Sequence, residues 1–299
     1  MSSMSSLLVN HTEFTYLHAQ VSQWSNRSRI ARSYGPGTHR SSFRGQGLET
    51  IDSRPYHPGD NIRHMDWRAT ARSGKAISKV FMDERQHNLF LIIDRRPAMF
   101  FGTRNMLKVT AAVKTAAVLA FSAIVNHDRA GGIIVDDQHD LFPSTRDINT
   151  TLKLLTAAAA PQIQNTTQQD EALSKAFAAA LTTAPNSTTI CLISDCDFVS
   201  KPNQHKEFYA LLDKYPMQVF QITDPAEFIL NDVGKLRIAS PDGTETCTID
   251  TSNKQVRDAY ALQAAEQQKH IRLQLLKWGV RHHTIQTKHD ILKQLETLI

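Results

Sequence analysis

Three short apolar runs of this chain each end in an aspartate. The runs are NLFLIID, GGIIVD and TTICLISD, and their last residues are Asp94, Asp136 and Asp195. In an open parallel sheet, ligands bind outside the carboxyl ends of the strands, and carboxylates there are suitable ligands for a hard cation such as magnesium. The alternative is that each aspartate caps the helix or turn that follows it. The pattern therefore predicts one sheet edge that carries either a cation site or a set of caps.

The elements that would position these aspartates alternate between strands and helices. Short apolar runs separated by helical patterns are typical of a parallel sheet covered on both faces. We expect strands at 88–94, 131–136, 188–195, 217–223 and 282–286. We expect helices at 12–32, 103–125, 147–159, 169–182, 203–214, 253–278 and 290–298. The segment 235–250 interrupts this alternation with two strands around a Pro-Asp-Gly turn, which predicts a β-hairpin insertion.

This layout resembles the von Willebrand factor A domain. That family builds a metal-ion-dependent adhesion site from a DxSxS sequence after the first strand, a threonine of a later loop and an aspartate after a later strand. The resemblance places Asp94-Arg95-Arg96-Pro97-Ala98 at the first motif and Asp195 at the later aspartate. Thr166 or Thr167 stands near the position of the threonine. Arg96 and Ala98 occupy the places of the two serines, so the resemblance implies a degenerate site.

The loss of both hydroxyls has a physical consequence. A hard cation of this kind needs about six oxygen ligands, and two of them are missing. An arginine also adds a fixed positive charge that attracts aspartates and repels a divalent ion. We expect Arg96 or Arg95 to replace the metal with a salt bridge, so that magnesium binds weakly at most and the protein has no cofactor. The alternative is that both arginines point to solvent and the site is simply lost.

An arginine-rich segment ahead of the first strand identifies a family more narrowly. The stretches RGQGLE (44–49), RPYHPGD (54–60) and RHMDWRATAR (63–72) resemble the signature of a bacterial family catalogued as domain of unknown function 58. Members carry this signature directly before a von Willebrand A-like domain, and the likeness covers almost the whole chain. The resemblance implies an α/β fold of the Rossmann-like von Willebrand A type, with a mostly parallel sheet flanked by helices. We expect an N-terminal helix and basic loop-rich segment at 1–85 and the α/β domain at 86–299.

The signature favours a structural task, since Pro58-Gly59-Asp60 is turn chemistry and Trp67 is a large apolar anchor for the sheet domain. Arginines interleave with aspartates, and guanidinium groups suit carboxylate pairing. The alternative is direct contact with a partner protein. The residues concerned are Arg54, Tyr56, Gly59, Asp60, Arg63, Asp66, Trp67, Arg68 and Arg72.

Composition limits the classes of function. Residues 1–85 hold 12 Lys and Arg against 7 Asp and Glu, a balance of +5 that equals the net charge of the 299-residue chain. Such a basic segment suits an acidic protein surface or, with less support, nucleic acid. The three cysteines form no CxxC pair, which indicates a reducing compartment. No signal peptide is apparent, and we interpret 109–125 as a buried helix. We therefore expect a cytoplasmic protein with no membrane partner.

The resemblance implies a non-enzymatic function. Family members are often encoded beside MoxR-type AAA+ ATPases and other von Willebrand A proteins. They are thought to serve as adaptors or in the assembly of complexes, so these two kinds of protein are the expected partners. One alternative is nucleic-acid binding through the basic segment, although no recognition helix supports it. Another is a metal-dependent enzyme that uses His57, Asp60, His64 and Asp66.

Overall fold

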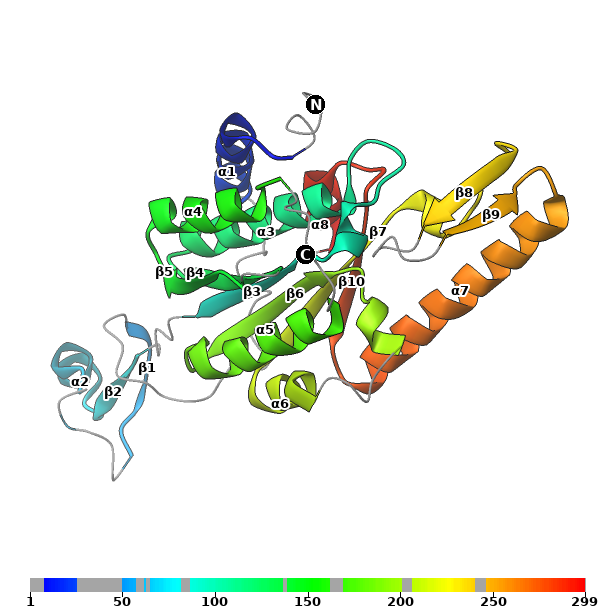
Figure 1. The fold of residues 1–299 in the computed structure, drawn as a ribbon. Coiled ribbons are helices and arrows are strands. Elements are labelled where there is room, and N and C mark those ends of the chain that lie inside the picture. Colours follow the sequence, from blue (N-terminus) through cyan, green and yellow to red (C-terminus); the bar gives the residue numbers. More distant parts are fainter. Residues whose placement is uncertain are drawn as a thin grey trace. The chain divides into compact units, whose positions relative to one another are not determined.

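Four parallel strands of the central sheet form from apolar runs that end in or next to an aspartate. Figure 1 shows these strands side by side in the sheet. The computed structural model describes residues 8–25, 50–57, 62, 65–81, 87–136, 139–161, 169–200, 206–239 and 246–298. By its internal contacts the chain divides into two units, which comprise residues 36–86 and the remainder.

The larger unit is built on a six-stranded sheet with the strand order β10-β7-β6-β3-β4-β5. Its five parallel strands are β3 (Asn88–Asp94), β4 (Arg129–Val135), β6 (Thr188–Ser194), β7 (Met217–Thr223) and β10 (Arg281–Gln286). The edge strand β5 (Leu141–Thr145) runs antiparallel to β4. The fold is therefore an α/β fold with a mostly parallel sheet, as the sequence predicts.

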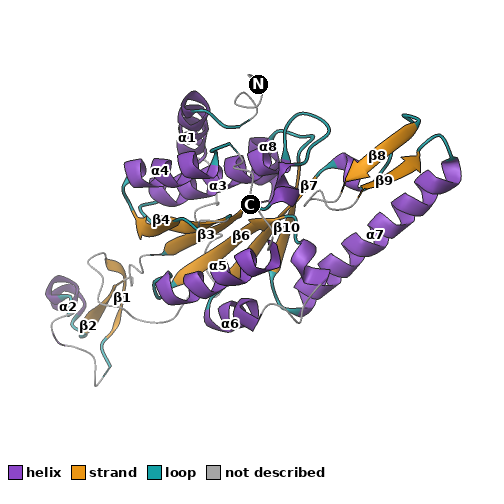
Figure 2. Cartoon of the chain, viewed as in Figure 1, coloured by secondary structure: helices purple, strands orange, loops and turns teal. Residues whose placement is uncertain are grey.

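Helices cover both faces of this sheet (Figure 2). One face carries α3 (Lys108–Val125), α4 (Ile148–Ala158) and α8 (Ile291–Leu298), with α1 (His11–Ser25) packed on α3. The other face carries α5 (Gln169–Thr183), α6 (Lys206–Lys214) and the end of α7 (Lys254–Lys277). Strand β3 serves both faces, since Leu89, Leu91 and Ile93 join the first core and Phe90 and Ile92 join the second. This alternation is the two-residue period of a strand buried on both sides.

Helix α3 is the buried central helix of the first face, as expected from its alanine-rich sequence. Its first residue is Lys108, five residues later than expected, because Thr103 does not cap the helix and instead bonds to Asp224. Within the described residues, α3 is the one helix that is long and apolar enough to cross a membrane. Its apolar window is 83% buried inside the protein.

The hairpin insertion is present as β8 (Lys235–Ala239) and β9 (Thr246–Asp250), which pair antiparallel. The predicted Pro-Asp-Gly turn between them lies outside the described residues. Helix α7 follows directly after β9 and begins at the N-cap Asn253. The edge strand β5 was not predicted from the sequence.

The smaller unit contains β1 (Thr50–Pro55) and β2 (Ile77–Phe81), which pair antiparallel. Between them lies α2 (Trp67–Ser73), which Asp66 caps and Gly74 ends in the left-handed conformation. The sequence predicts a loop-rich segment here, so this hairpin and helix were not expected. It also placed the N-terminal helix in this region, whereas α1 clusters with the sheet unit.

Candidate functional site

The carboxyl end of β3 places Asp94 at the centre of the sheet edge, where it is fully buried. Its carboxylate accepts hydrogen bonds from the Arg96 backbone N–H at 3.0 Å, from Arg96 Nε at 3.0 Å and from Arg96 Nη2 at 2.7 Å. The Ser194 hydroxyl at the end of β6 donates a further bond to Oδ2 at 2.6 Å. This paired arrangement is the bidentate geometry that guanidinium groups make with carboxylates. Both oxygens of Asp94 are therefore engaged inside the protein.

The same guanidinium joins two further carboxylates. Arg96 Nη2 lies 2.6 Å from Asp197 Oδ1 and 3.5 Å from Asp195 Oδ1, and the Arg96 side chain is 1% exposed. Burial disfavours the charged guanidinium, but Asp94, Asp197 and Asp195 outweigh this effect and raise the pKa of Arg96. The structure thus places Arg96, and not Arg95, between Asp94, Asp195 and Asp197.

A second buried cation, Lys108 at the start of α3, completes the ionic network. Lys108 Nζ lies 3.3 Å from Asp195 Oδ2 and 2.6 Å from Glu227 Oε1. Burial disfavours the charged amine, but the two carboxylates outweigh burial and raise the pKa of Lys108. We call the set of Asp94, Arg96, Lys108, Asp195, Asp197 and Glu227 the edge network.

The two aspartates that follow β6 differ in their titration. Burial acts against ionisation of Asp195, but Lys108 and Arg96 outweigh it and hold the pKa of this carboxyl below its ordinary value. Burial and the adjacent Asp195 charge raise the pKa of Asp197 to about 6. Between them, Cys196 has a φ of 65°, a left-handed conformation that is uncommon for a residue with a side chain. The turn directs both carboxylates toward Arg96.

Both cations of the edge network are buried, and two of its four carboxylates reach the surface. The Arg96 and Lys108 side chains are 1% and 3% exposed, whereas those of Asp197 and Glu227 are 39% and 29% exposed. Four carboxylates face two cations in the network, so it carries an excess of negative charge when all groups are ionised. The members of the network that reach solvent, Asp197 and Glu227, are both acidic.

Arg95 has a different task from its neighbour. Its guanidinium donates to the backbone carbonyls of Ala157 and Ala160, at 3.0 and 2.6 Å, at the end of α4. It also lies 3.4 Å from Asp136, the aspartate after β4. A cation at a helix C-terminus is favoured by the helix dipole. Burial lowers the pKa of Arg95 in spite of Asp136, and the pair fixes α4 to the edge.

Asp224, directly after β7, organises a neighbouring part of the edge. Its buried carboxylate accepts bonds from the Thr103 backbone N–H at 3.0 Å, the Thr103 hydroxyl at 2.5 Å and the Thr287 hydroxyl at 2.7 Å. Burial acts to raise the pKa of Asp224, but the hydrogen bonds from Thr103 and Thr287 outweigh burial and lower this pKa below its ordinary value. Three loops are therefore joined at one carboxylate.

The edge does not fit a divalent cation in the manner of a von Willebrand adhesion site. The guanidinium of Arg96 stands between the aspartates, and Ala98 lies half-buried without an oxygen ligand in its side chain. The candidate threonines Thr166 and Thr167 lie outside the described residues. The residues around Asp94 suit ion pairing with Arg96 better than coordination of a metal ion.

The signature segment is described in part. Asp66 caps α2 by accepting a bond from the Ala69 N–H at 3.0 Å. Trp67 is 64% exposed, Arg68 and Arg72 are exposed, and Tyr56 is half-buried. The placement of Gly59, Asp60, Arg63 and His64, and the side chain of Arg54, lie outside the described residues. The anchoring of Trp67 to the sheet domain stays a prediction.

Sequence reasoning missed the residues that complete the edge network. Asp197 could have been found as the second acidic residue of the sequence SDCDF, where Asp195 was already a candidate. Lys108 offered a weaker signal, as a charge at the start of an apolar helix. Glu227 has no sequence signal for this role, because a contact across 119 positions of the chain depends on the fold.

The fold and the edge define an α/β protein whose mostly parallel sheet carries an internally paired ionic network at its carboxyl end. A von Willebrand factor type A protein from Catenulispora acidiphila is among the similar solved structures, with a TM-score of 0.39 and 8% identity. The match covers 74% of this chain and 42% of that one. This chain belongs to the family described as protein of unknown function DUF58, which matches residues 52–270.

A curated relative and further structures extend these comparisons. An uncharacterized protein of Mycobacterium bovis is 26% identical over 263 residues, which is 87% of this chain and 81% of the relative. An aerotolerance-related membrane protein from Bacteroides fragilis aligns with a TM-score of 0.38 and 12% identity, over 70% of this chain and 95% of that one. An uncharacterized membrane spanning protein from Vibrio fischeri aligns with a TM-score of 0.24 and 18% identity, over 71% and 96% of the two chains.

These descriptions correct the prediction of location. The sequence predicted a cytoplasmic protein without a membrane partner, on the grounds that no signal peptide is apparent and the apolar helix is buried. Two of the similar solved structures are described as membrane proteins. The prediction of a cytoplasmic location is therefore wrong and is not retained. Burial of α3 concerns only that helix and says nothing about the location of the protein.

Proposed function

We propose that this protein is a non-enzymatic interaction module, an adaptor that works with a MoxR-type AAA+ ATPase in the assembly or remodelling of client proteins. Other von Willebrand A proteins are further proposed partners. The observation that carries the proposal is the internal pairing of the edge network, in which Arg96 binds Asp94 and Asp197 at 2.7 and 2.6 Å. The family resemblance supplies the class of partner.

Internal pairing argues for binding over catalysis. A general base needs a free lone pair within reach of a substrate proton, whereas both oxygens of Asp94 accept bonds from Arg96 and Ser194. Burial lowers the pKa of His282, whose Nε2 lies 3.0 Å from Gln221 Oε1. Burial also lowers the pKa of His283 to about 4, and its ring stacks on Phe220. Both histidines lie on β10 and contact β7, which gives them a role in packing.

Two surfaces qualify for contact with the ATPase. The first is the acidic outer rim of the edge network, where Asp197 and Glu227 are partly exposed. The second is the exposed face of α2 with Trp67, Arg68 and Arg72. Tryptophan and arginine are enriched among residues that dominate the binding energy of protein interfaces. We place the partner contact on α2, because its Trp67 is 64% exposed and belongs to this enriched class.

A binding experiment with a purified MoxR-type ATPase of the same genome tests the proposal. The full chain is immobilised, and binding is measured with and without ATP. We expect Trp67→Ala and the pair Arg68→Glu/Arg72→Glu each to weaken binding at least about tenfold, the size of effect seen at interface hot spots. The matched control is Lys175→Glu on α5, whose side chain is 61% exposed and, among the described residues, pairs with Glu171 one helical turn away.

The outcomes separate the alternatives. Absence of binding by the wild-type chain rejects the ATPase as partner. Binding that persists in the α2 variants but is lost in Asp197→Lys/Glu227→Lys moves the contact to the sheet edge. Far-ultraviolet circular dichroism of each variant shows whether the fold is retained. A nucleic-acid partner is the second candidate, supported only by the basic balance of residues 1–85.

A further inference from the structure

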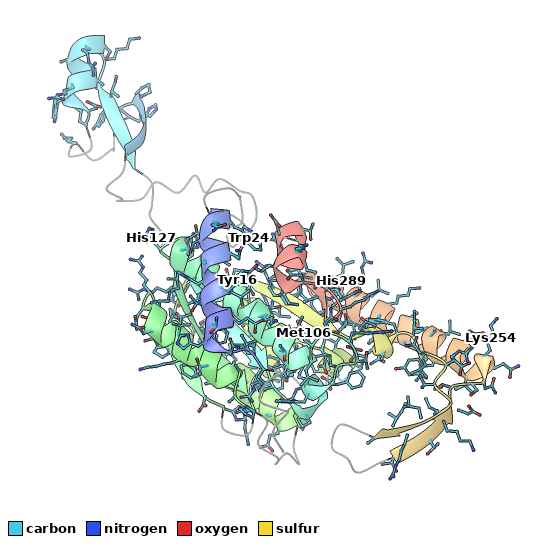
Figure 3. All side chains as sticks on the ribbon, turned by 90° about the horizontal axis from the view of Figure 1, so that it is seen from above. Tyr16, Trp24, Met106, His127, Lys254 and His289 are labelled. Carbon is cyan, nitrogen blue, oxygen red and sulfur yellow. The ribbon has the colours of Figure 1, made fainter. Side chains whose placement is uncertain are left out.

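Helix α7 (Lys254–Lys277) presents an apolar stripe to solvent. The 24-residue helix is held to the sheet unit by Ile271 and Leu275, which are 1% and 0% exposed. On the opposite side, Leu262, Leu273 and Leu276 are 64%, 53% and 70% exposed. Figure 1 shows the helix extending beyond the sheet, and Figure 3 shows Lys254 at its far end. Single exposed leucines are common on protein surfaces. Whether these three form a binding surface therefore depends on their spacing along the helix.

The exposed leucines fit a heptad repeat. Steps of three and four residues alternate along the stripe, and all its members are exposed: Ala259, Leu262, Glu266, Lys269, Leu273 and Leu276. In heptad terms, Ala259, Glu266 and Leu273 take the a positions, and Leu262, Lys269 and Leu276 take the d positions. The buried Ile271 and Leu275 fall at f and c. The side of α7 that faces the protein is therefore distinct from the side that carries this exposed stripe, which we call the seam.

The order of residues along this seam is self-complementary when two copies run antiparallel. A twofold axis between Gln267 and Gln268 brings Glu266 opposite the partner's Lys269, and it brings Leu262 opposite the partner's Leu273. In antiparallel pairs, a positions meet d positions in this way, and a twofold contact repeats each pair. A parallel pair would instead place Glu266 against Glu266 and Lys269 against Lys269. Like charges at such positions are unfavourable, so the central charges select the antiparallel register.

We propose that the seam of α7 (Ala259, Leu262, Glu266, Lys269, Leu273 and Leu276) binds a second copy of this chain as an antiparallel helix pair. Leucine layers lie on either side of two central Glu266–Lys269 pairs. The seam is about 25 Å long at 1.5 Å per residue, and a contact of this size lies at the low end of specific interfaces. The dimer is consequently weak and concentration-dependent. This inference is independent of the proposed ATPase partner.

Sedimentation equilibrium of the full chain over a range of concentrations tests the proposal. The wild type is expected to shift from monomer toward dimer as the concentration rises. Leu262→Glu weakens dimerisation at least about tenfold, because each copy loses a leucine layer and gains a desolvated charge. The matched control is Ile229→Glu, since Ile229 lies outside α7 and is 65% exposed against 64% for Leu262. The control is expected to dimerise as the wild type does.

A charge exchange tests the register. Glu266→Lys places two lysine pairs at the centre, and Lys269→Glu places two glutamate pairs there. Each single change is expected to weaken dimerisation, and the double exchange Glu266→Lys/Lys269→Glu is expected to restore it. Neither residue is buried in the monomer, so the fold of each variant is retained. Weakening by the single changes without restoration by the double exchange overturns the antiparallel register.

Cysteine pairing provides an independent geometric test, made in a Cys247→Ser background because Cys247 is the exposed native cysteine among the described residues. A mixture of Leu262→Cys and Leu273→Cys chains is expected to form a disulfide-linked dimer on mild oxidation. Leu262→Cys alone is expected not to do so, because the two copies of position 262 lie about 16 Å apart along the antiparallel pair, beyond disulfide reach. A monomeric wild type at every concentration, or crosslinking by Leu262→Cys alone, overturns the proposal.

Discussion

At the scale of single residues, the guanidinium of Arg96 neutralises carboxylates that would otherwise repel one another. Asp94, Asp195 and Asp197 all lie within 3.5 Å of Arg96 Nη2. Buried ion pairs of this kind add little net stability when formed, but they are costly to break, because the remaining charge is left without its partner. The contribution of the edge network to stability is therefore best measured by removing one of its members.

Replacement of Arg96 is expected to destabilise the fold strongly. Arg96→Met leaves Asp94 buried without a counterion, which costs about 3–5 kcal/mol in the free energy of unfolding. Arg96→Lys keeps the charge but loses the two-nitrogen grip on Asp94, so we expect about half that loss. Urea unfolding measures both. The control Arg237→Met, at an exposed position of β8, is expected to change stability by no more than about 0.5 kcal/mol.

Metal binding is a second test at this scale. We expect the wild type to bind magnesium or manganese with no dissociation constant below about 1 mM, because the positive charge of Arg96 stands among the carboxylates. The double variant Arg96→Ser/Ala98→Ser restores the two hydroxyl positions of the adhesion-site pattern and is expected to gain magnesium binding. Calorimetric titration compares the two proteins. Tight binding by the wild type that Asp94→Ala abolishes would refute the expectation.

The pH dependence of stability reports on Asp197. Its pKa is raised from the ordinary 3.8 to about 6, so the folded protein binds more protons than the unfolded chain between about pH 4 and pH 6. Stability contributed by this group is therefore lost as the pH rises through that window. Asp195 acts in the opposite sense, since its lowered pKa adds stability that is lost on acidification below about pH 4.

Asp197→Asn is expected to remove the loss of stability between about pH 4 and pH 6. Because the side chain is 39% exposed, solvent screening limits the effect to about 1 kcal/mol or less. Urea unfolding of wild type and variant at several pH values measures the difference. Identical pH profiles for the two proteins would show that Asp197 does not titrate in this window.

Part of the edge could be predicted from sequence for a clear physical reason. Asp94 and Asp195 follow apolar runs that form parallel strands, and such strands end at one edge, so their proximity follows from the pattern alone. The choice between Arg95 and Arg96 could not be made, because adjacent residues point in different directions and only the fold determines which direction faces the carboxylates. Lys108 was missed because a charge ahead of an apolar helix ordinarily faces water.

At the scale of elements, continuous apolar runs gave reliable strand bounds. Strands β3 and β7 have the expected ends, since both are buried along their whole length and leave no ambiguity. Strand β5 was missed because it is an edge strand with a mixed pattern of burial and contains Pro143, which weakens any strand prediction. Helix α2 was missed because its seven residues have no buried side chain and so show no apolar period.

Helix α1, the N-terminal helix, packs on the sheet unit. Its Phe14, Leu17 and Val21 are 2%, 4% and 2% exposed and belong to the core shared with α3. Phe14→Ala is expected to lower the free energy of unfolding by about 3–5 kcal/mol, as for other buried phenylalanines. Tyr16→Ala on the same helix, where the side chain is 56% exposed, serves as control. Equal effects of the two changes would mean that α1 is not an integral part of the fold.

At the scale of the whole molecule, the basic charge of the chain does not come from the sheet edge, because the edge network holds four carboxylates against two cations. The chain has a net charge of +5 and an isoelectric point near 9.1. However, Arg95, Arg96 and Lys108 are buried at the sheet edge, where their charges are compensated by carboxylates and carbonyls. Of the more exposed cations, Lys175 pairs with Glu171 and Arg257 with Asp232. A nucleic-acid partner would require a contiguous basic face, which the edge network does not supply.

Binding to generic duplex DNA is therefore expected to be weak and non-specific. We expect a dissociation constant no lower than about 10⁻⁶ M at physiological salt, the range of non-specific binding. Fluorescence anisotropy at several salt concentrations measures both affinity and its salt dependence. Arg68→Glu/Arg72→Glu is expected to remove the weak binding seen at low salt, since both arginines are exposed on α2. Nanomolar binding that survives physiological salt and depends on these arginines would favour nucleic acid over an ATPase as the partner of the signature segment.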